Sequence, residues 1–95
     1  FVQYGPKQGV SGVVTDILQD EKGNLWLGSY DGILFLDSKQ ISSISTNVEK
    51  TLNFKTITQK NGLVDRHAYQ LLMLPEGKLA VGSPKGIQVF DVPNL

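Results

Sequence analysis

Apolar residues occur in this chain as short runs separated by polar turns that contain glycine. The runs at 25–27 and 33–36 are unbroken, and short unbroken apolar runs between turn signals are typical of strands covered on both faces. The segment 20–23 has Asp first and Gly fourth, and 74–77 has Pro second and Gly fourth, so both predict type I turns. The pattern predicts strands at residues 13–19, 24–29, 33–37, 68–74, 78–83 and 87–91, with shorter strands at 1–4 and 54–58.

The same pattern occurs twice along the chain. Residues 23–29 align with residues 77–83 at an offset of 54, and the alignment continues through Gly32, which matches Gly86. Near the start of each copy the offset is 53, and it matches Phe1 with Phe54, Lys7 with Lys60 and Gly9 with Gly62. Each copy therefore reads strand, tight turn, strand, tight turn, strand. An internal repeat of this kind predicts stacked units that cover one another.

No segment has convincing helical signals to cover these strands. The best helical spacing is that of Ile41, Ile44, Val48 and Leu52, but the residues between them are mainly Ser, Thr and Asn, which are poor helix formers. We expect residues 38–53 to be a loop with at most one helical turn. Sheets that cover other sheets at this repeat length indicate a β-propeller.

The predicted fold class is therefore all-β, a β-propeller fragment of about two four-stranded antiparallel blades. We expect residues 1–95 to form one partial propeller. Residues 1–4 would be the outer strand of a preceding blade, residues 13–58 the first blade, and residues 68–91 the first three strands of a second blade. Two blades cannot close a ring of four to eight, so homo-oligomers through exposed blade faces and strand edges are expected.

Composition removes several classes of function. Nine Lys and Arg balance nine Asp and Glu, so the net charge is zero, and nucleic acid is not an expected partner. The chain has no cysteine, which excludes disulfides and cysteine-based zinc sites. We expect no metal, no cofactor and no catalytic residue. The chain begins with Phe1, and we expect it to be a piece of a longer protein whose remaining blades are its partners.

One stretch resembles a known family. Residues 14–29, VTDILQDEKGNLWLGS, followed by DGIL at 31–34, are similar to the two-component regulator propeller repeat. The second copy departs from the repeat, because it has Ala80 where Trp26 stands in the first copy, Leu74 in place of Asp, and Pro84 in its second turn. The resemblance implies the periplasmic sensor domain of a hybrid two-component histidine kinase, or of a membrane-bound diguanylate cyclase. It also implies a ligand that is an oligosaccharide, a polysaccharide or another small molecule.

A candidate ligand site follows from the topology. The loop from an outer strand to the next inner strand lies at the same rim as the second tight turn of a blade, which groups Arg66 and His67 with Tyr30 and Asp31. The same rule places Lys85, in the second tight turn of the second copy, and Ser11, in the earlier loop, at this rim. Arg66 is the only arginine and His67 the only histidine, and a guanidinium fork can clamp a carboxylate or sugar hydroxyls. The alternative interpretation is a set of solvated loop side chains. Trp26, between two leucines, is expected to pack between blades.

Three functions remain open at this point. The first is a non-enzymatic sensor segment that binds a ligand and transmits the signal to an output domain. The second is a piece of a propeller enzyme, a lyase or hydrolase, which would present His, Glu or Arg at repeated inner-loop positions. The chain offers one His and one Arg, which favours the sensor. The third is a protein-interaction scaffold.

Overall fold

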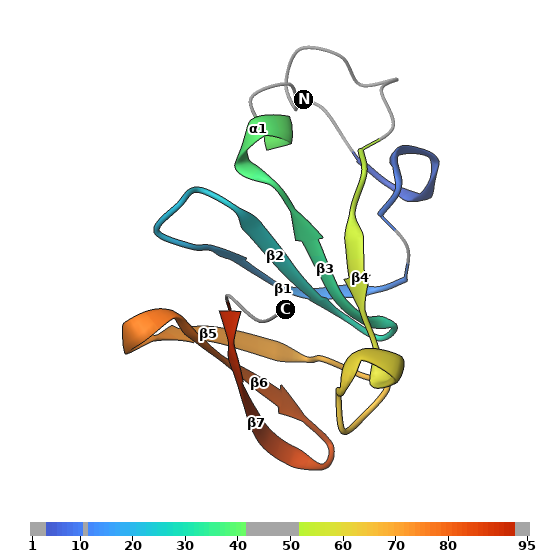
Figure 1. Ribbon diagram of the computed structural model, residues 1–95. Coiled ribbons are helices and arrows are strands. Elements are labelled where there is room, and N and C mark those ends of the chain that lie inside the picture. Colours follow the sequence, from blue (N-terminus) through green and yellow to red (C-terminus); the bar gives the residue numbers. More distant parts are fainter. Residues whose placement is uncertain (1–3, 11, 42–51, 93–95) are drawn as a thin grey trace.

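Two antiparallel sheets form the molecule (Figure 1). The computed structural model describes residues 4–10, 12–41 and 52–92. The first blade is a four-stranded sheet in the order β1 (Val14–Gln19), β2 (Leu25–Ser29), β3 (Gly32–Leu36) and β4 (Lys55–Ile57). The second blade is a three-stranded sheet in the order β5 (Gln70–Leu74), β6 (Lys78–Ser83) and β7 (Gly86–Asp91). The fold is all-β, as predicted, and is consistent with a propeller fragment.

The strands lie where the sequence pattern predicts them, with boundaries that differ by no more than two residues. The expected helical turn is α1 (Ser38–Ile41), and the rest of that link up to residue 51 lies outside the described residues. Of the strand expected at 1–4, residues 1–3 also lie outside them, and Tyr4 is not in a strand. The division into residues 1–4, 13–58 and 68–91 of one partial propeller stays a prediction.

The remaining short elements are three 3₁₀ turns, η1 (Pro6–Gln8), η2 (Gln59–Asn61) and η3 (Pro75–Gly77). The last corrects one expectation, because the turn at 74–77 is not of type I. Glu76 has φ 65° and ψ 29°, whereas the third residue of a type I turn has φ near −90°. Glu76 and Gly77 are both left-handed, which is the backbone geometry that reverses this hairpin.

The hydrophobic core lies between the two blades. It contains Trp26, Ile33 and Ile57 from the first blade, Leu71, Leu79 and Val81 from the second, and Leu63 and Ala68 from the link. The Trp26 side chain is 2% exposed, and its ring meets the ring of Phe35 edge-on at 4.5 Å between centroids. Trp26 therefore packs between blades, as its leucine neighbours predict.

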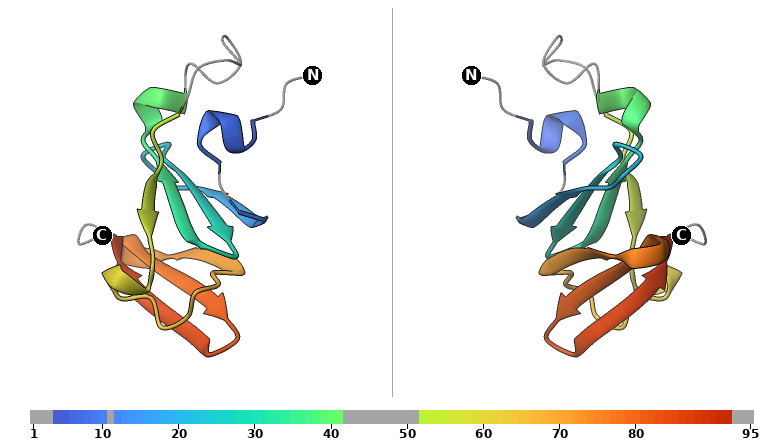
Figure 2. Two further views of the ribbon diagram at one scale, coloured as in Figure 1. Left: turned by 90° about the vertical axis from the view of Figure 1, so that its right-hand side faces the viewer. Right: turned by 90° about the vertical axis from the view of Figure 1, so that its left-hand side faces the viewer.

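The inner strands β1 and β5 are tied by polar contacts as well as by packing. Thr15 Oγ1 donates to the Tyr69 carbonyl oxygen at 2.8 Å, and Asp16 Oδ2 accepts from the Leu71 amide at 2.7 Å. The Ala68 amide donates to the Ser29 carbonyl oxygen at 2.9 Å, which joins the link to β2. These bonds set the position of the second blade against the first. Figure 2 shows the two blades packed against each other from two sides.

Candidate functional site

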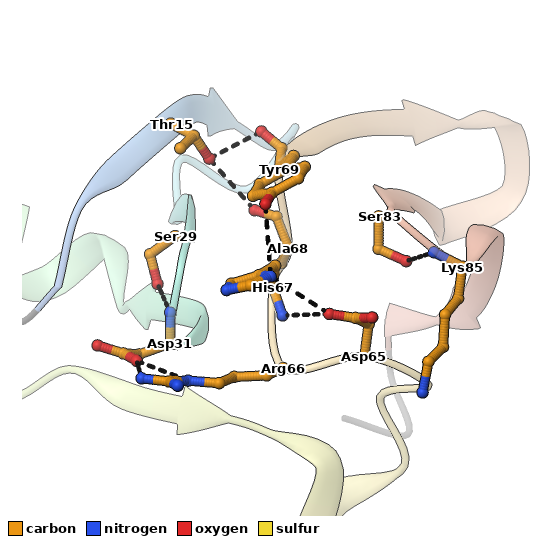
Figure 3. A network of polar contacts seen from close by, with 10 residues as sticks. All are labelled: Thr15, Ser29, Asp31, Asp65, Arg66, His67, Ala68, Tyr69, Ser83 and Lys85. Carbon is orange, nitrogen blue, oxygen red and sulfur yellow. Dashed lines mark hydrogen bonds and ion pairs between the residues drawn. The ribbon is translucent and has the colours of Figure 1, made fainter.

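The β2–β3 turn and the link before β5 meet at one end of the blades, and this places the four predicted site residues together. Arg66 comes from the link and reaches across to Asp31 in the turn (Figure 3). Its Nη2 lies 2.9 Å and its Nε 3.3 Å from Asp31 Oδ1. The side chains are 71% and 43% exposed, so water screens the pair and it adds little to stability. Both groups remain accessible to a ligand.

Short-range hydrogen bonds hold the two loops. Ser29, which is fully buried, donates from Oγ to the Gly32 carbonyl oxygen at 2.7 Å and accepts from the Asp31 amide at 3.1 Å. In the link, Asp65 Oδ1 accepts from the His67 amide at 2.9 Å. The backbone on both sides of the Arg66–Asp31 pair is therefore fixed by groups that belong to the loops themselves.

Three aromatic rings gather beside the ion pair. Tyr30 meets His67 and Tyr69 edge-on, with centroids 5.3 Å and 5.6 Å away. His67 and Tyr69 stack at 5.2 Å with 12° between their planes, and the Tyr69 hydroxyl lies 3.4 Å from His67 Nδ1. We call Tyr30, Asp31, Arg66, His67 and Tyr69 the rim cluster. Rings in such edge-on and stacked arrangements offer faces and edges for a flat or ring-shaped ligand.

Tyr69 is the member of this cluster that the sequence analysis missed. It falls inside the strand predicted at 68–74, where a tyrosine reads as an ordinary strand residue. The strand begins at Gln70 instead, and Tyr69 closes the link. The available signal was its position two residues after His67, which places the two side chains on the same side of an extended backbone.

A hollow of about 390 Å³ opens next to the ion pair. Its lining residues are Asp31, Thr58, Gln59, Lys60 and Arg66. Two cationic side chains face one carboxylate here, so the electrostatic balance favours an anionic group. Gly12 lies directly behind Asp31, because a Cβ there would be 2.7 Å from Asp31 Oδ2.

Two other residues expected at this rim are not part of the cluster. Lys85, in the β6–β7 turn, donates from its backbone amide to Ser83 Oγ at 3.2 Å, and Figure 3 shows its side chain apart from the Arg66–Asp31 pair. Ser11 lies outside the described residues. The rim cluster therefore belongs to the first blade and the link, with Lys85 at the equivalent turn of the second blade.

A larger groove of about 690 Å³ lies at the opposite end, where the β1–β2 turn of the first blade faces the β5–η3 turn of the second. Apolar side chains form most of its wall, among them Trp26, Phe35, Met73, Leu74, Pro75 and Val92. It arises because the two sheets diverge there. Sequence reasoning did not find it, since the angle between two sheets leaves no local pattern.

Residues 4–10, 12–41 and 52–92 contain neither a metal-binding cluster nor a membrane-spanning helix. No group of three His, Cys, Asp or Glu side chains in these ranges lies close enough together to hold a metal ion. No helix there is long and apolar enough to cross a membrane.

Comparison with known protein families supports the resemblance seen in the sequence. Residues 8–31 match the family model described as Two component regulator propeller. The match includes β1, β2 and the turn that carries Tyr30 and Asp31, so the repeat family is confirmed for this part of the chain. No curated protein matches the sequence.

Proposed function

We propose that this chain is a non-enzymatic segment of an extracytoplasmic ligand-sensing propeller of a hybrid two-component histidine kinase. The family match at residues 8–31 supports the two-component part of this proposal. The rim cluster supports the ligand-sensing part, because it combines three aromatic rings with an accessible arginine and carboxylate.

The chemistry of the rim favours a saccharide that carries carboxylate groups. Aromatic rings pack against the apolar face of a sugar ring, and an arginine fork pairs with a carboxylate through two parallel hydrogen bonds. Arg66 pairs with Asp31, and Lys60 lines the same hollow. A uronate carboxylate would compete with Asp31 for Arg66 and would also be attracted by the positive charge of Lys60. A neutral sugar would make only stacking and hydroxyl contacts.

Calorimetric titration of the 95-residue chain with acidic and neutral oligosaccharides tests this proposal. We expect oligogalacturonate to bind more tightly than a neutral oligosaccharide of equal length, with an affinity that falls as salt rises. Tyr30→Ala and Arg66→Ala should each weaken binding by about tenfold or more, as the loss of roughly 1.4 kcal/mol does. Lys85→Ala, at the equivalent turn of the second blade, is the matched control and should bind normally.

Two outcomes would contradict the proposal. One is the absence of binding to either class at millimolar ligand, and the other is binding that Tyr30→Ala and Arg66→Ala leave unchanged. Chromatography of the oligosaccharides after incubation with the chain distinguishes an enzyme from a sensor, because a lyase or hydrolase would release shortened products. An unchanged chain length together with rim-dependent binding is the result expected of a sensor.

A further inference from the structure

The apolar groove between the blades, at the end opposite the rim cluster, has the size and character of a ligand site. Its volume of about 690 Å³ falls within the range of roughly 300–1,000 Å³ that small-molecule pockets occupy. Phe35, Met73 and Val92 line it and are only partly buried, at the edge of the core between the blades. An apolar ligand would cover these side chains and remove more of their surface from water.

One wall of the groove is a row of side chains across the first blade. The strand register pairs Trp26 with Phe35 and Phe35 with Lys55, and directly paired residues project from the same face of a sheet. The row therefore runs from a buried ring through a half-buried ring to an exposed lysine. A lysine stem can lie along apolar surface while its ammonium group stays in water, so Lys55 adds a cation at the open side of an apolar wall.

The polar side chains of the β1–β2 turn that line the groove are largely used within the first blade. Asp20 accepts hydrogen bonds from Asn24 Nδ2 at 3.1 Å and from Trp26 Nε1 at 2.9 Å. Asn24 Oδ1 in turn accepts from the Ser38 amide at 2.9 Å. Because the indole N–H of Trp26 is satisfied in this way, its ring offers only apolar surface to the groove.

The remaining charged side chains of the lining are Lys22, Lys55 and Glu21. In the described part of the chain, none of these three takes part in an ion pair. The fourth charged group, Asp20, already accepts four hydrogen bonds inside its own blade. Two unpaired cations thus face one unpaired carboxylate, and this balance favours a ligand that carries a negative charge.

We infer that the apolar groove binds a fatty acid anion of medium chain length, with the acyl chain between the blades and the carboxylate at Lys55. Such a molecule combines the apolar body and the single anionic head that the lining would accommodate. In Figure 1 the β1–β2 turn and η3 lie together at the left, whereas the β2–β3 turn and the link lie at the right. The site is therefore separate from the rim cluster and does not depend on saccharide binding there.

Trp26 gives a direct readout of binding, because it is the only tryptophan and its ring borders the groove. Decanoate is titrated into the 95-residue chain below its micelle-forming concentration, and Trp26 fluorescence and heat are recorded. We expect saturable binding of about one ligand per chain, with an affinity that falls as salt rises. 1-Decanol, which lacks the charge, should bind about fivefold more weakly. Equal affinity for decanol, or no saturable binding of decanoate, overturns the inference.

Lys55→Gln tests the contact with the carboxylate. Lys55 is exposed on β4, so the substitution should leave the fold intact. We expect it to weaken decanoate binding by about fivefold and to leave decanol binding unchanged, because only the carboxylate loses a partner. Lys85→Gln, an exposed lysine in the β6–β7 turn, is the matched control and should bind decanoate normally. Equal losses in the two variants would contradict the placement of the carboxylate at Lys55.

Leu74→Glu tests the apolar wall. Leu74 lines the groove at the end of β5, whereas Leu72 of the same strand is 60% exposed and lies outside the lining. We expect Leu74→Glu to abolish decanoate binding, because it adds a negative charge where the acyl chain would lie, and Leu72→Glu to bind normally. Circular dichroism verifies that both variants fold. A folded Leu74→Glu variant with unchanged affinity overturns the inference, and Lys55→Gln decides the matter if Leu74→Glu does not fold.

The rim variants distinguish this site from the rim cluster. Arg66→Ala and Tyr30→Ala should leave decanoate binding unchanged, and Lys55→Gln should leave oligogalacturonate binding unchanged. Loss of decanoate binding in the rim variants would mean that the fatty acid binds at the rim, which overturns the groove as its site. A chain that binds decanoate but no oligosaccharide would contradict the proposed saccharide sensing and support the groove.

Discussion

At the scale of single residues, one carboxylate organises the β1–β2 turn and orients the core tryptophan. Asp20 accepts hydrogen bonds from the amides of Lys22 and Asn24, both at 2.9 Å, and from the Asn24 side chain at 3.1 Å. It also accepts from Trp26 Nε1 at 2.9 Å. Burial alone would raise the pKa of Asp20, but the bonds from Trp26, Asn24 and Lys22 outweigh it and the pKa lies below its ordinary value.

We expect Asp20→Asn to destabilise the chain by about 1–3 kcal/mol, because an amide replaces a charged acceptor that serves four donors. Urea unfolding at neutral pH, followed by circular dichroism, measures the loss. Glu21→Gln, in the same turn, is exposed and should change stability by less than about 0.5 kcal/mol. Equal losses of unfolding free energy in the two variants would show that the hydrogen bonds of Asp20 do not stabilise the fold.

The stabilisation by Asp20 should also depend on pH. A carboxyl whose pKa is lower in the folded state than in the unfolded state stabilises the fold above the unfolded pKa, and this contribution disappears as pH falls through the folded pKa. The difference in unfolding free energy between the wild-type chain and Asp20→Asn should therefore be full at neutral pH and shrink below about pH 4. A difference that stays constant from pH 7 to pH 3 would contradict this assignment.

The repeat gives a matched pair of glycines with opposite expected responses. Gly28→Ala would force a Cβ to within 2.5 Å of the Ala68 carbonyl oxygen, whereas Gly82→Ala would place one in ordinary contact at 3.6 Å from Gln70. We expect Gly28→Ala to cost about 1–3 kcal/mol through this overlap. Gly82→Ala should leave the folded single chain intact. Thermal unfolding of both variants at one low concentration makes the comparison, and equal loss in both would be the contrary result.

At the scale of elements, the contact between β1 and β5 depends on side chains of β1 that form hydrogen bonds with backbone groups at β5. Asp16 accepts from the Leu71 amide of the other blade and, through its second oxygen, from its own neighbour Ile17 at 2.9 Å. Its repeat equivalent, Gln70, is exposed on β5. The same strand position thus joins blades in the first copy and faces outward in the second.

We expect Asp16→Ala to destabilise the chain by about 1–3 kcal/mol, since it leaves the Leu71 amide without its charged partner at a blade contact. Gln70→Ala serves as the matched control and should have an effect of less than about 0.5 kcal/mol. Guanidinium unfolding of the two variants beside the wild-type chain provides the measurement. If Gln70→Ala proved as harmful as Asp16→Ala, the blade-bridging role of Asp16 would be wrong.

The elements themselves could be predicted from the sequence because their signals are local. Glycine-containing turns and unbroken apolar runs place all seven described strands, and the repeat places them twice. The type I turn at 74–77 was wrong because Pro and Gly at those positions also fit a turn with a left-handed residue, and Glu76 takes that geometry. Nothing in the spacing distinguishes the two.

For the candidate site, the order of the strands predicts which loops meet at one rim, but not the contacts that their side chains make. Tyr30, Asp31, Arg66 and His67 come together because the second turn and the following link must share one rim. Tyr69 was missed because one strand starts two residues later than its pattern suggests. The stacking of His67 on Tyr69 and the bond from Leu71 to Asp16 depend on the exact approach of two blades, which no single segment encodes.

At the scale of the whole molecule, the buried apolar residues of the second blade all belong to a core that it shares with the first blade. Trp26 and Ile33 contribute from one sheet and Leu79 and Val81 from the other, and all four are at most 2% exposed. A three-stranded sheet with one wet face has little apolar area of its own to bury, so most of its stability comes from the neighbouring blade. The blades should therefore lose their structure together.

Trp26, the only tryptophan, makes this testable because it lies in the first blade against the second. We expect one urea transition in which Trp26 fluorescence, which reports on the blade contact, and far-UV circular dichroism, which reports on all strands, coincide at equal protein concentration. Leu79→Ala, in the second blade, should cost about 2–5 kcal/mol and lower both midpoints equally. Separate transitions, or a Leu79→Ala variant whose Trp26 signal unfolds as in the wild-type chain, would mean that each sheet is stable alone, which contradicts a core shared between them.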